Sequence, residues 1–123
     1  MTPGSPIARW LGFSVSETAG GRVDRLAFNK THIGNPAIRA LHGGVIAAFL
    51  ELAMQTELRA TGAAPAGTVN VAIDYLSSSR AEDMTASVRI IRVGRRLAFL
   101  EAEGRQADGT RLVAIARACL KLG

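Results

Sequence analysis

The stretch RALHGGVIAAFLELAM (residues 39–54) decides how this chain is expected to fold. After its two glycines the stretch is almost wholly apolar, and one acid, Glu51, interrupts it. The apolar spacing predicts a helix over residues 43–60, which Gly62 and Pro65 then end. No other part of the sequence has a long helical pattern, so this segment is expected to be the central helix of the fold.

The helix face that carries Glu51 differs from the others. With 100° between successive residues, the side chains within about 60° of Glu51 are those of Gly44, Ala47, Ala48, Met54, Gln55 and Leu58. The remaining faces are large and apolar, which indicates a helix buried on most sides. Small residues near its start leave room for a ligand, a second helix or water beside the acid. A salt bridge to an arginine, or exposure at the helix edge, is the alternative explanation of Glu51.

Three residues, His42, Gly43 and Gly44, lead directly into this helix. Glycine is a poor helix former, so two glycines in the first turn call for a reason. Without a Cβ, a ligand could touch the backbone N–H groups, which lack intrahelical partners and lie at the positive end of the helix dipole. These groups could bind a phosphate or the oxygen of a polarised carbonyl. A simple loop-to-helix turn is the alternative.

Six further segments have the pattern of strands. Two precede the helix, at residues 13–19 and 22–29, and Gly20-Gly21 between them suits a tight turn. Four follow the helix in what we expect to be hairpin succession, at residues 68–78, 84–93, 96–106 and 111–122. In the first of these four, alternation predicts one shared face for Val69, Val71, Ile73 and Tyr75. Residues 7–13 are expected to form a short helical turn that packs Trp10 and Leu11.

The fold class predicted from this order is α+β, with one long helix against a six-stranded antiparallel sheet. A length of 123 residues suits a single domain that spans residues 1–123. The composition, 48% hydrophobic and 20% charged, is that of an ordinary globular protein and excludes a disordered chain. A domain this small buries a limited share of its surface, so we expect it to form oligomers.

Cysteine usage and the amino terminus favour a cytoplasmic protein. Cys119 is the single cysteine, so an intrachain disulfide is impossible and a cysteine-based zinc site is not expected. The opening residues, MTPGSPIARW, lack the basic start and long apolar run of a signal peptide. The longest apolar run, residues 45–50, is too short to cross a bilayer, so no membrane partner is expected.

The net charge is +5, and the 15 basic residues are arginine except for Lys30 and Lys121. Arginine suits phosphate groups, so charge alone allows a phosphate-bearing small molecule, nucleic acid, or a merely solvated basic surface. The arginines are scattered, and one Trp and one Tyr provide few stacking platforms for bases. We therefore expect no nucleic-acid partner.

The segment LHGGVIAAFLELA (residues 41–53) resembles the HGG-x6-D/E helix of hotdog-fold acyl-CoA thioesterases. It is most similar to the PaaI-type group, which is related to phenylacetate-pathway and 4-hydroxybenzoyl-CoA thioesterases. The segments TVNVAIDYLSSSR and, from Val88 to Leu120, VRIIRVGRRLAFLEAEGRQADGTRLVAIARACL are similar to the strands of that family. The resemblance implies a curved six-stranded antiparallel sheet wrapped around one long central helix. It also implies at least a homodimer, often a homotetramer, with active sites at the dimer interface.

The same resemblance implies hydrolysis of an acyl-CoA thioester to the free acid and coenzyme A. Coenzyme A belongs to the substrate, so neither a separate cofactor nor a metal is expected. Glu51 matches the catalytic acid, which acts as general base on water or as nucleophile on the thioester carbon. Gly43 matches the glycine whose N–H polarises the thioester carbonyl, with the Gly44 amide beside it. His42 matches a histidine that helps bind this carbonyl; its alternative role is to pack against the helix and satisfy loop carbonyls.

Further positions carry over as substrate-binding residues. Thr68 matches a Ser/Thr position that places the water, and Gln55 matches a polar position used in another branch. Each is also explained as a routine polar residue. Arg80, Arg95 and Arg96 lie in predicted loops and are expected to contact the phosphates of coenzyme A, with solvated turn arginines as the alternative.

One position departs from the family pattern. Many members carry Asn or Gln six residues before the histidine, where the side chain hydrogen-bonds the carbonyl, and this chain has Pro36 there. Asn35 is adjacent, and the loop reads as though it held one extra residue. Either Asn35 binds the carbonyl from a shifted loop, or this contact is lost.

Two other functions stay open at this point. A non-catalytic acyl-CoA binding or sensing module would use the same pocket and basic surface, and would bind acyl-CoA without releasing thiol. A hotdog enoyl-CoA hydratase would need a His/Asp pair suited to water addition. The only histidines are His32 and His42, and neither is predicted on the helix beside Glu51. Hydration of crotonyl-CoA distinguishes this second alternative.

Overall fold

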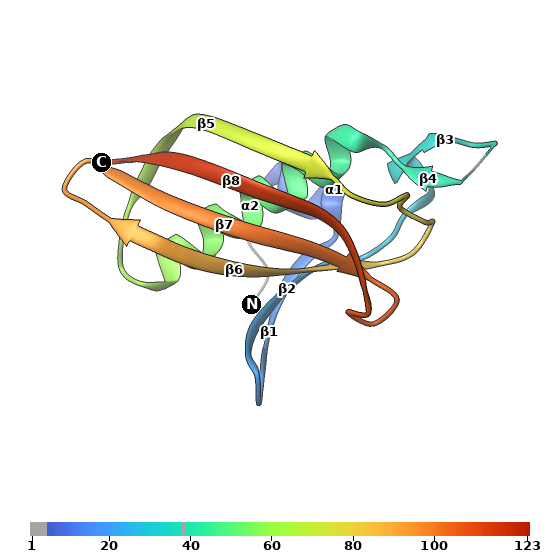
Figure 1. Ribbon diagram of the computed structural model, residues 1–123, viewed down its shortest axis with the longest axis horizontal. Coiled ribbons are helices and arrows are strands. Elements are labelled where there is room, and N and C mark those ends of the chain that lie inside the picture. Colours follow the sequence, from blue (N-terminus) through green and yellow to red (C-terminus); the bar gives the residue numbers. More distant parts are fainter. Residues whose placement is uncertain (1–4, 38) are drawn as a thin grey trace.

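A computed structural model describes residues 5–37 and 39–123, and the predicted α+β architecture is confirmed (Figure 1). The helices are α1 (Pro6–Leu11) and α2 (Gly43–Ala60), with a 3-10 turn at Lys30–His32. The strands are β1 (Phe13–Thr18), β2 (Gly21–Leu26), β3 (Ile33–Asn35), β4 (Ala40–Leu41), β5 (Pro65–Tyr75), β6 (Met84–Val93), β7 (Leu97–Gln106) and β8 (Arg111–Leu122). The long helix has its predicted bounds, whereas the short pair β3 and β4 was not predicted.

Six strands form one antiparallel sheet in the order β1-β2-β6-β7-β8-β5. The hairpins β6–β7 and β7–β8 are confirmed, but the expected hairpin between β5 and β6 is wrong. β5 pairs with β8 at the far edge, while residues 76–83 carry the chain to β6, which lies beside β2. Alternation in a sequence indicates that a strand is half-buried but not which neighbour it takes, so this order is a tertiary outcome.

The hydrophobic core lies between α2 and one face of the sheet, and Figure 1 shows α2 behind the long strands β5, β8, β7 and β6. The largest fully buried side chains of α2 are those of Phe49, Leu50, Met54 and Leu58. Gly104 in β7 permits this close approach, because a Cβ there would lie 3.2 Å from Leu50. Each buried side chain of this size contributes about 1.5–3 kcal/mol, so the contact holds the helix in a defined place.

The amino-terminal segment forms α1, which Ser5 caps and Gly12 ends with a left-handed φ of 63°. Leu11 is fully buried, as predicted, together with Ala8. Trp10 packs its ring against His32 but remains 45% exposed, so of the two residues expected to pack only Leu11 is fully buried. A helix this short buries one stripe of side chains, and Trp10 lies outside that stripe.

A β-bulge in β5 changes which side chains face α2. Thr68 pairs with Leu120 and Asn70 pairs with Cys119, so Val69 is an extra residue without a partner on β8. The alternation shifts by one residue at this point, and Thr68 takes the inward position. Val69 is 58% exposed, so the prediction that it shares the inner face is wrong. Bulges of this kind re-aim side chains and are common beside functional sites.

Candidate functional site

Glu51 and Thr68 meet where α2 lies beside β5. The Thr68 hydroxyl donates a hydrogen bond of 2.7 Å to Glu51 Oε2, and the Gln55 amide donates to the same oxygen at 3.5 Å. Glu51 Oε1 has no hydrogen-bond donor among the described residues. The structure therefore brings together the predicted residues Glu51, Gln55 and Thr68, and leaves one carboxylate oxygen open.

Neither alternative explanation of Glu51 fits these contacts. The ion pairs between described residues involve other acids, and the hydrogen-bond partners of Glu51 are neutral. The side chain is half-buried rather than fully exposed at the helix edge. A carboxylate with one oxygen anchored and no bound cation is able to accept a proton or attack a carbon.

His42 caps the amino terminus of α2 with its own ring. Its Nδ1 accepts the Gly44 N–H at 2.9 Å, and its backbone carbonyl accepts N–H bonds from Val45 and Ile46. Because Nδ1 is an acceptor, the neutral imidazole carries its proton on Nε2, which stays available as a donor. The Gly44 amide is thus occupied within the chain, and the expectation that it polarises a carbonyl stays a prediction. The Gly43 N–H has no acceptor among the described residues.

The glycines around His42 provide steric room for its ring. A Cβ on Gly44 would lie 3.1 Å from His42 Nδ1, and a Cβ on Gly34 would lie 2.8 Å from His42 Cα. By contrast, a Cβ on Gly43 would meet the Tyr75 hydroxyl at 3.5 Å, which is an ordinary contact. The His42 cap therefore gives a steric reason for glycine at position 44.

Tyr75 is a site residue that the sequence analysis missed. Its hydroxyl donates a hydrogen bond of 2.7 Å to the Gly43 carbonyl. This contact ties the last residue of β5 to the first residue of α2. The alternation of β5 could have indicated this position, because it puts Tyr75 on the same face as Val71 and Ile73, and that face is turned toward the helix.

The buried His32 links α1 to the loop that precedes α2. Its Nδ1 accepts the Asn29 N–H at 3.1 Å, and its Nε2 lies 2.8 Å from the Trp10 carbonyl oxygen. The His32 carbonyl accepts the His42 N–H at 2.8 Å. Both histidines therefore act on backbone groups, and neither forms the pair with Glu51 that the hydratase alternative requires.

An apolar groove of about 340 Å³ opens beside the start of α2. Its lining residues are Ile7, Trp10, Thr31, Ile33, His42, Gly44, Val45 and Ala48. Gly44 and Ala48 belong to the helix face that carries Glu51, so the groove runs along one side of that face. Ile7 and Trp10, each 45% exposed, supply the α1 wall.

The three arginines expected to bind CoA phosphates do not come together within one chain. Arg80 lies at the end of the sheet near the start of α2, and its backbone N–H donates to the buried Gln106 side chain at 2.8 Å. Arg95 and Arg96 lie in the turn between β6 and β7, at the other end of β7. The length of β7 separates the two positions by roughly 30 Å. All three arginines are exposed.

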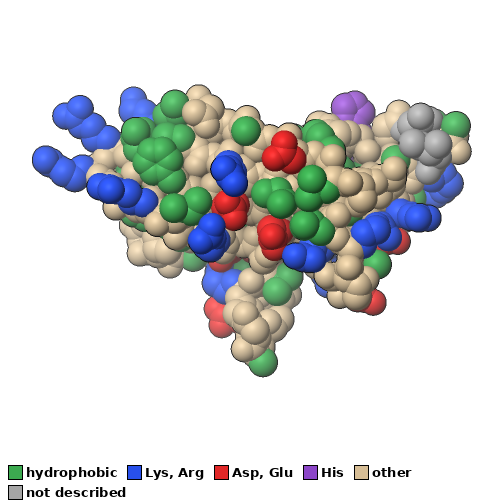
Figure 2. All heavy atoms as spheres, viewed as in Figure 1, with side chains coloured by type: hydrophobic (Ala, Val, Ile, Leu, Met, Phe, Trp, Pro, Cys, Tyr) green, Lys and Arg blue, Asp and Glu red, His purple; other side chains and the backbone are tan. Residues whose placement is uncertain are grey.

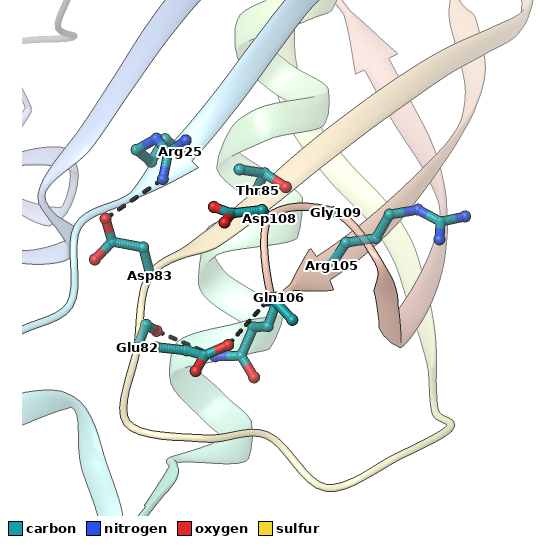
Figure 3. Close-up of a pocket in the computed structure, with 9 residues that line it drawn as sticks. Arg25, Glu82, Asp83, Thr85, Arg105, Gln106, Asp108 and Gly109 are labelled. Atoms are coloured by element: carbon teal, nitrogen blue, oxygen red, sulfur yellow. Dashed lines mark hydrogen bonds and ion pairs between the residues drawn. The ribbon is translucent and has the colours of Figure 1, made fainter.

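A second hollow, of about 270 Å³, lies between the β7–β8 turn and the start of β6 (Figure 3). Its walls carry charges of both signs. Asp83 pairs with Arg25 at 3.4 Å, and Glu82 Oε1 accepts the Ala107 N–H at 2.9 Å. Figure 3 shows Arg105 pointing away from both acids. Since Glu82 and Asp83 are satisfied by the protein itself, this hollow is a junction between loops rather than a reaction site.

Asn35 is the remaining predicted residue. Its backbone belongs to β3, and its side chain lies outside the described residues. The expectation that Asn35 replaces the amide displaced by Pro36 therefore stays a prediction.

A buried acid pair that the sequence did not indicate lies along the second half of α2. Asp24 in β2 is 1% exposed, and neither of its carboxyl oxygens has a hydrogen-bond partner among the described residues. Glu57 is held by Arg22, with Nε 2.7 Å from Oε1 and Nη2 3.3 Å from Oε2. Burial, together with the adjacent Glu57 carboxylate, raises the pKa of Asp24 to about 8. Asp24 is therefore mostly protonated at neutral pH.

Across residues 5–37 and 39–123, no group of three or more His, Cys, Asp or Glu side chains is arranged to hold a metal ion. In that part of the chain, no helix is both long and apolar enough to cross a membrane. The candidate reactive groups of α2 are the Gly43 N–H and the His42 imidazole at its start and the Glu51 carboxylate two turns further on.

Sequence comparison relates the site-bearing segment to known enzymes. The profile described as Thioesterase superfamily matches residues 39–113, a range that includes all of α2 and β5. The medium/long-chain acyl-CoA thioesterase YigI of Salmonella typhimurium LT2 is 31% identical over 121 residues, which cover 84% of this chain and 77% of YigI.

Structural comparison extends the similarity over nearly the whole chain. A crystal structure of a thioesterase-superfamily protein is 32% identical with a TM-score of 0.86, covering 97% of this chain and 90% of that one. A phenylacetic acid degradation-related protein of Ralstonia eutropha JMP134 is 25% identical with a TM-score of 0.83, covering 97% and 91%. The hotdog fold and the PaaI-type resemblance implied by the HGG motif are confirmed.

Proposed function

We propose that this chain, which belongs to the thioesterase superfamily, hydrolyses an acyl-CoA thioester to the free acid and coenzyme A. The observation that carries the proposal is the Glu51 carboxylate, whose Oε2 is held by Thr68 at 2.7 Å while Oε1 stays open. The similarity to a medium/long-chain acyl-CoA thioesterase supports this substrate class. No separate cofactor enters the proposed reaction, since water is the second reactant.

In the proposed reaction, the thioester carbonyl oxygen accepts a hydrogen bond from the Gly43 N–H. That N–H is at the positive end of the α2 dipole, where negative charge developing on the oxygen is stabilised. One preorganised donor of this kind contributes about 3–4 kcal/mol to stabilising the transition state. The Nε2–H of His42 is the second donor at the same end, because the Gly44 bond to Nδ1 holds the ring in that tautomer.

Glu51 acts in one of two ways. As a general base, Oε1 takes a proton from water while the water oxygen bonds to the thioester carbon; the C–S bond then breaks and the CoA thiolate takes up a proton. As a nucleophile, Oε1 bonds to that carbon, the CoA thiolate leaves, and water hydrolyses the resulting anhydride. Rapid-quench mass spectrometry distinguishes the routes, since only the second adds an acyl mass to the protein.

The donor and the acid are proposed to come from two protomers. Eight residues separate Gly43 from Glu51, which is about 12 Å along α2. A thioester held at Gly43 is more readily reached by Glu51 of a neighbouring helix that runs the opposite way. β5 is the 11-residue edge strand of the sheet, and long open edges are normally covered. We therefore expect a homodimer in which two β5 strands pair antiparallel and two α2 helices lie side by side.

The same dimer would bring the arginines together. Antiparallel pairing of β5 with its copy aligns the Pro65 end of one strand with the Tyr75 end of the other. The Arg95–Arg96 turn is at the Pro65 end, because Leu122 pairs with Pro65 and donates its N–H to the Arg96 carbonyl. Arg95 and Arg96 of one protomer would then lie at the same end as Arg80 of the other, as a CoA molecule with several phosphates would require.

The outer face of the sheet supports a second association, into a homotetramer. Ile91, Leu97 and Phe99 are exposed apolar residues of β6 and β7. Figure 2 shows hydrophobic side chains gathered with Lys and Arg at one end of this face, and Asp and Glu side chains toward its middle. In a two-fold contact, the basic end of this face on one copy would lie against the acidic middle of the same face on the other copy, so the charges would be complementary. Light scattering should give a tetramer for the wild type and a dimer for Phe99→Asp.

The proposed compartment is the cytoplasm. Cys119 is buried and free of any disulfide. A free thiol of this kind suits a reducing environment.

The test of the proposed function is thiol release from a panel of acyl-CoA substrates. Glu51→Gln removes both the base and the nucleophile but keeps a side chain of similar shape that Thr68 can still bond. We expect a loss of about 10²–10⁴-fold in kcat with an unchanged melting temperature. Glu17→Gln, at an exposed acid remote from the site, is the matched control.

Full turnover by Glu51→Gln would contradict the assignment. Tight binding without thiol release by the wild type would favour a binding module, and hydration of crotonyl-CoA would favour a hydratase.

Mixed dimers test whether the site is shared. Inactive Glu51→Gln and inactive His42→Ala protomers are refolded or co-expressed together. If each site takes its acid and its donors from different protomers, half of the dimers regain one intact site and the mixture recovers about a quarter of wild-type activity. If one protomer supplies the whole site, mixing recovers nothing beyond the sum of the parents.

A further inference from the structure

We propose that the apolar groove between α1 and α2 holds the acyl chain of the thioester, and that Trp10 and Ala48 determine which acyl groups fit. This inference rests on the proposed thioesterase function and adds its substrate class, an acyl group with an apolar chain or ring. The groove, of about 340 Å³, is lined at one end by His42, one of the two groups proposed to bind the carbonyl.

The covalent structure of the substrate links the groove to the site. The acyl chain starts at the carbonyl carbon, so a carbonyl bound at the start of α2 places the first chain atoms beside that helix end. His42 and Gly44 lie at this end, and both line the groove. The CoA portion is large and anionic, so it would extend into solvent toward the exposed arginines. The groove is therefore left for the chain.

The walls of the groove have the chemistry that a hydrocarbon chain needs. Ile7, Ile33 and Val45 present only apolar side-chain atoms. The polar side-chain groups of the lining are those of Thr31 and His42 and the indole N–H of Trp10. Pockets of a few hundred Å³ with mainly apolar walls and a few polar groups at one end are typical of small-ligand sites. The polar His42 end would contact the carbonyl, and the apolar remainder would contact the chain.

Trp10 is exposed, but its position is fixed by contacts with His32. A side chain that limits which acyl groups fit must be fixed in this way. Its ring contacts the buried His32 ring edge-on, with 4.7 Å between the centroids. Its backbone carbonyl oxygen lies 2.8 Å from His32 Nε2. An aromatic ring that is held in this way yet 45% exposed offers a preformed apolar surface to a ligand.

Ala48 lies on the α2 side of the groove, three residues before Glu51. Its methyl group is the smallest side chain that a non-glycine residue can offer, and it leaves the groove open along the Glu51 face. A phenyl group at this position would occupy the space that the outer part of an acyl chain needs. Short acyl groups, which end close to the carbonyl, would be affected less.

The kinetic experiment compares octanoyl-CoA with acetyl-CoA. We expect Ala48→Phe to lower the octanoyl-to-acetyl ratio of kcat/KM by about tenfold or more, because filling an apolar pocket discriminates on that scale. Trp10→Ala should lower the same ratio, because it removes the apolar surface on the α1 side of the groove. This variant tests the inference if Ala48→Phe does not fold. Ala60→Phe is the matched control, since it makes the same substitution at an exposed position of the same helix.

A binding experiment gives a readout that does not depend on turnover. Trp10 is the single tryptophan of the chain, so its fluorescence reports directly on the groove. The thioether S-octyl-CoA, which cannot be hydrolysed, should shift the Trp10 emission, whereas free CoA should leave it nearly unchanged. Ala48→Phe should weaken the S-octyl-CoA response by about tenfold or more, and Ala60→Phe should preserve it.

The outcomes separate this inference from the proposed function. If the wild type releases thiol but the ratio is unchanged in Ala48→Phe and Trp10→Ala, the groove assignment is overturned and thioesterase function stands. If Ala48→Phe slows both substrates equally and also weakens inhibition by free CoA, the groove holds the pantetheine arm and the inference is again overturned. If the wild type releases no thiol, the proposed function fails, and the Trp10 titration alone decides whether the groove binds the chain.

Discussion

The Thr68 hydroxyl donates a 2.7 Å hydrogen bond to Glu51 Oε2 because a bulge at Val69 turns Thr68 toward the helix. With strict alternation, β5 would have placed Val69 against α2 and Thr68 on the outer face. One extra residue in one strand thus decides which side chain meets the acid. The polar contact anchors one carboxylate oxygen and leaves the other to react.

Thr68→Val should slow hydrolysis by about tenfold to a hundredfold, because a hydrogen bond to a charged group contributes about 1.5–3 kcal/mol. The loss is expected in kcat, since the bond positions Glu51 rather than the substrate. Thr68→Ser keeps the hydroxyl and should retain most of the rate. Steady-state assays of both variants check this, and equal rates for Thr68→Val and Thr68→Ser would contradict it.

His42 combines a cap with a donor, and two substitutions separate these roles. His42→Ala loses the cap and should lower the free energy of unfolding by about 1 kcal/mol, along with activity. His42→Asn keeps an oxygen that can accept the Gly44 N–H, so stability should be retained while the Nε2–H donor is lost. Thermal melts and kcat/KM together test this; full activity in His42→Asn would show that the ring acts only as a cap.

Tyr75→Phe should loosen the first turn of α2, because the hydroxyl no longer binds the Gly43 carbonyl. We expect a loss of about 0.5–1.5 kcal/mol in unfolding free energy and a lower kcat/KM. Ser77→Ala is a suitable control, since it removes an exposed side-chain bond of 2.9 Å to the Leu112 carbonyl, outside the proposed contacts with substrate. If both variants lose stability but neither loses activity, the Tyr75 contact is purely structural.

Asp24 should make the folded state less stable as pH rises through neutrality. The carboxyl ionises near 3.8 without its folded environment, but in the folded chain its pKa is raised to about 8. Between these values the folded state binds a proton that the unfolded chain releases, so this stabilisation is complete below 3.8 and is lost as pH approaches 8. The slope for one such proton is at most about 1.4 kcal/mol per pH unit.

Asp24→Asn removes this pH dependence, because an amide of nearly the same shape replaces the carboxyl group and cannot ionise. The wild-type melting temperature should fall by several degrees between about pH 5 and pH 8 relative to that of Asp24→Asn. Asp74→Asn, at an exposed position, should follow the wild type. Parallel melting curves for the wild type and Asp24→Asn across this range would show that Asp24 does not carry the proton.

Much of the fold was predictable because it depends on local spacing. The helix over residues 43–60 follows from one long 3.6-residue pattern between glycine pairs and breakers, and its bounds are confirmed. Strands at residues 84–93 and 111–122 also have their predicted bounds, since turn residues mark their ends. The strand that pairs with β5 was not predictable, because the alternation of a half-buried strand does not identify which strand lies beside it.

By itself, the sequence determined that Glu51 interrupts the apolar first part of a helix whose start is glycine-rich, and this followed from residue order alone. Tertiary structure alone decided what surrounds that acid. A register shift brings Thr68 to Glu51, the hydroxyl of Tyr75 reaches Gly43, and the ring of His42 takes the Gly44 amide. These contacts join residues far apart in the chain, or depend on the orientation of one ring, and neither is encoded in the periodicity of side chains.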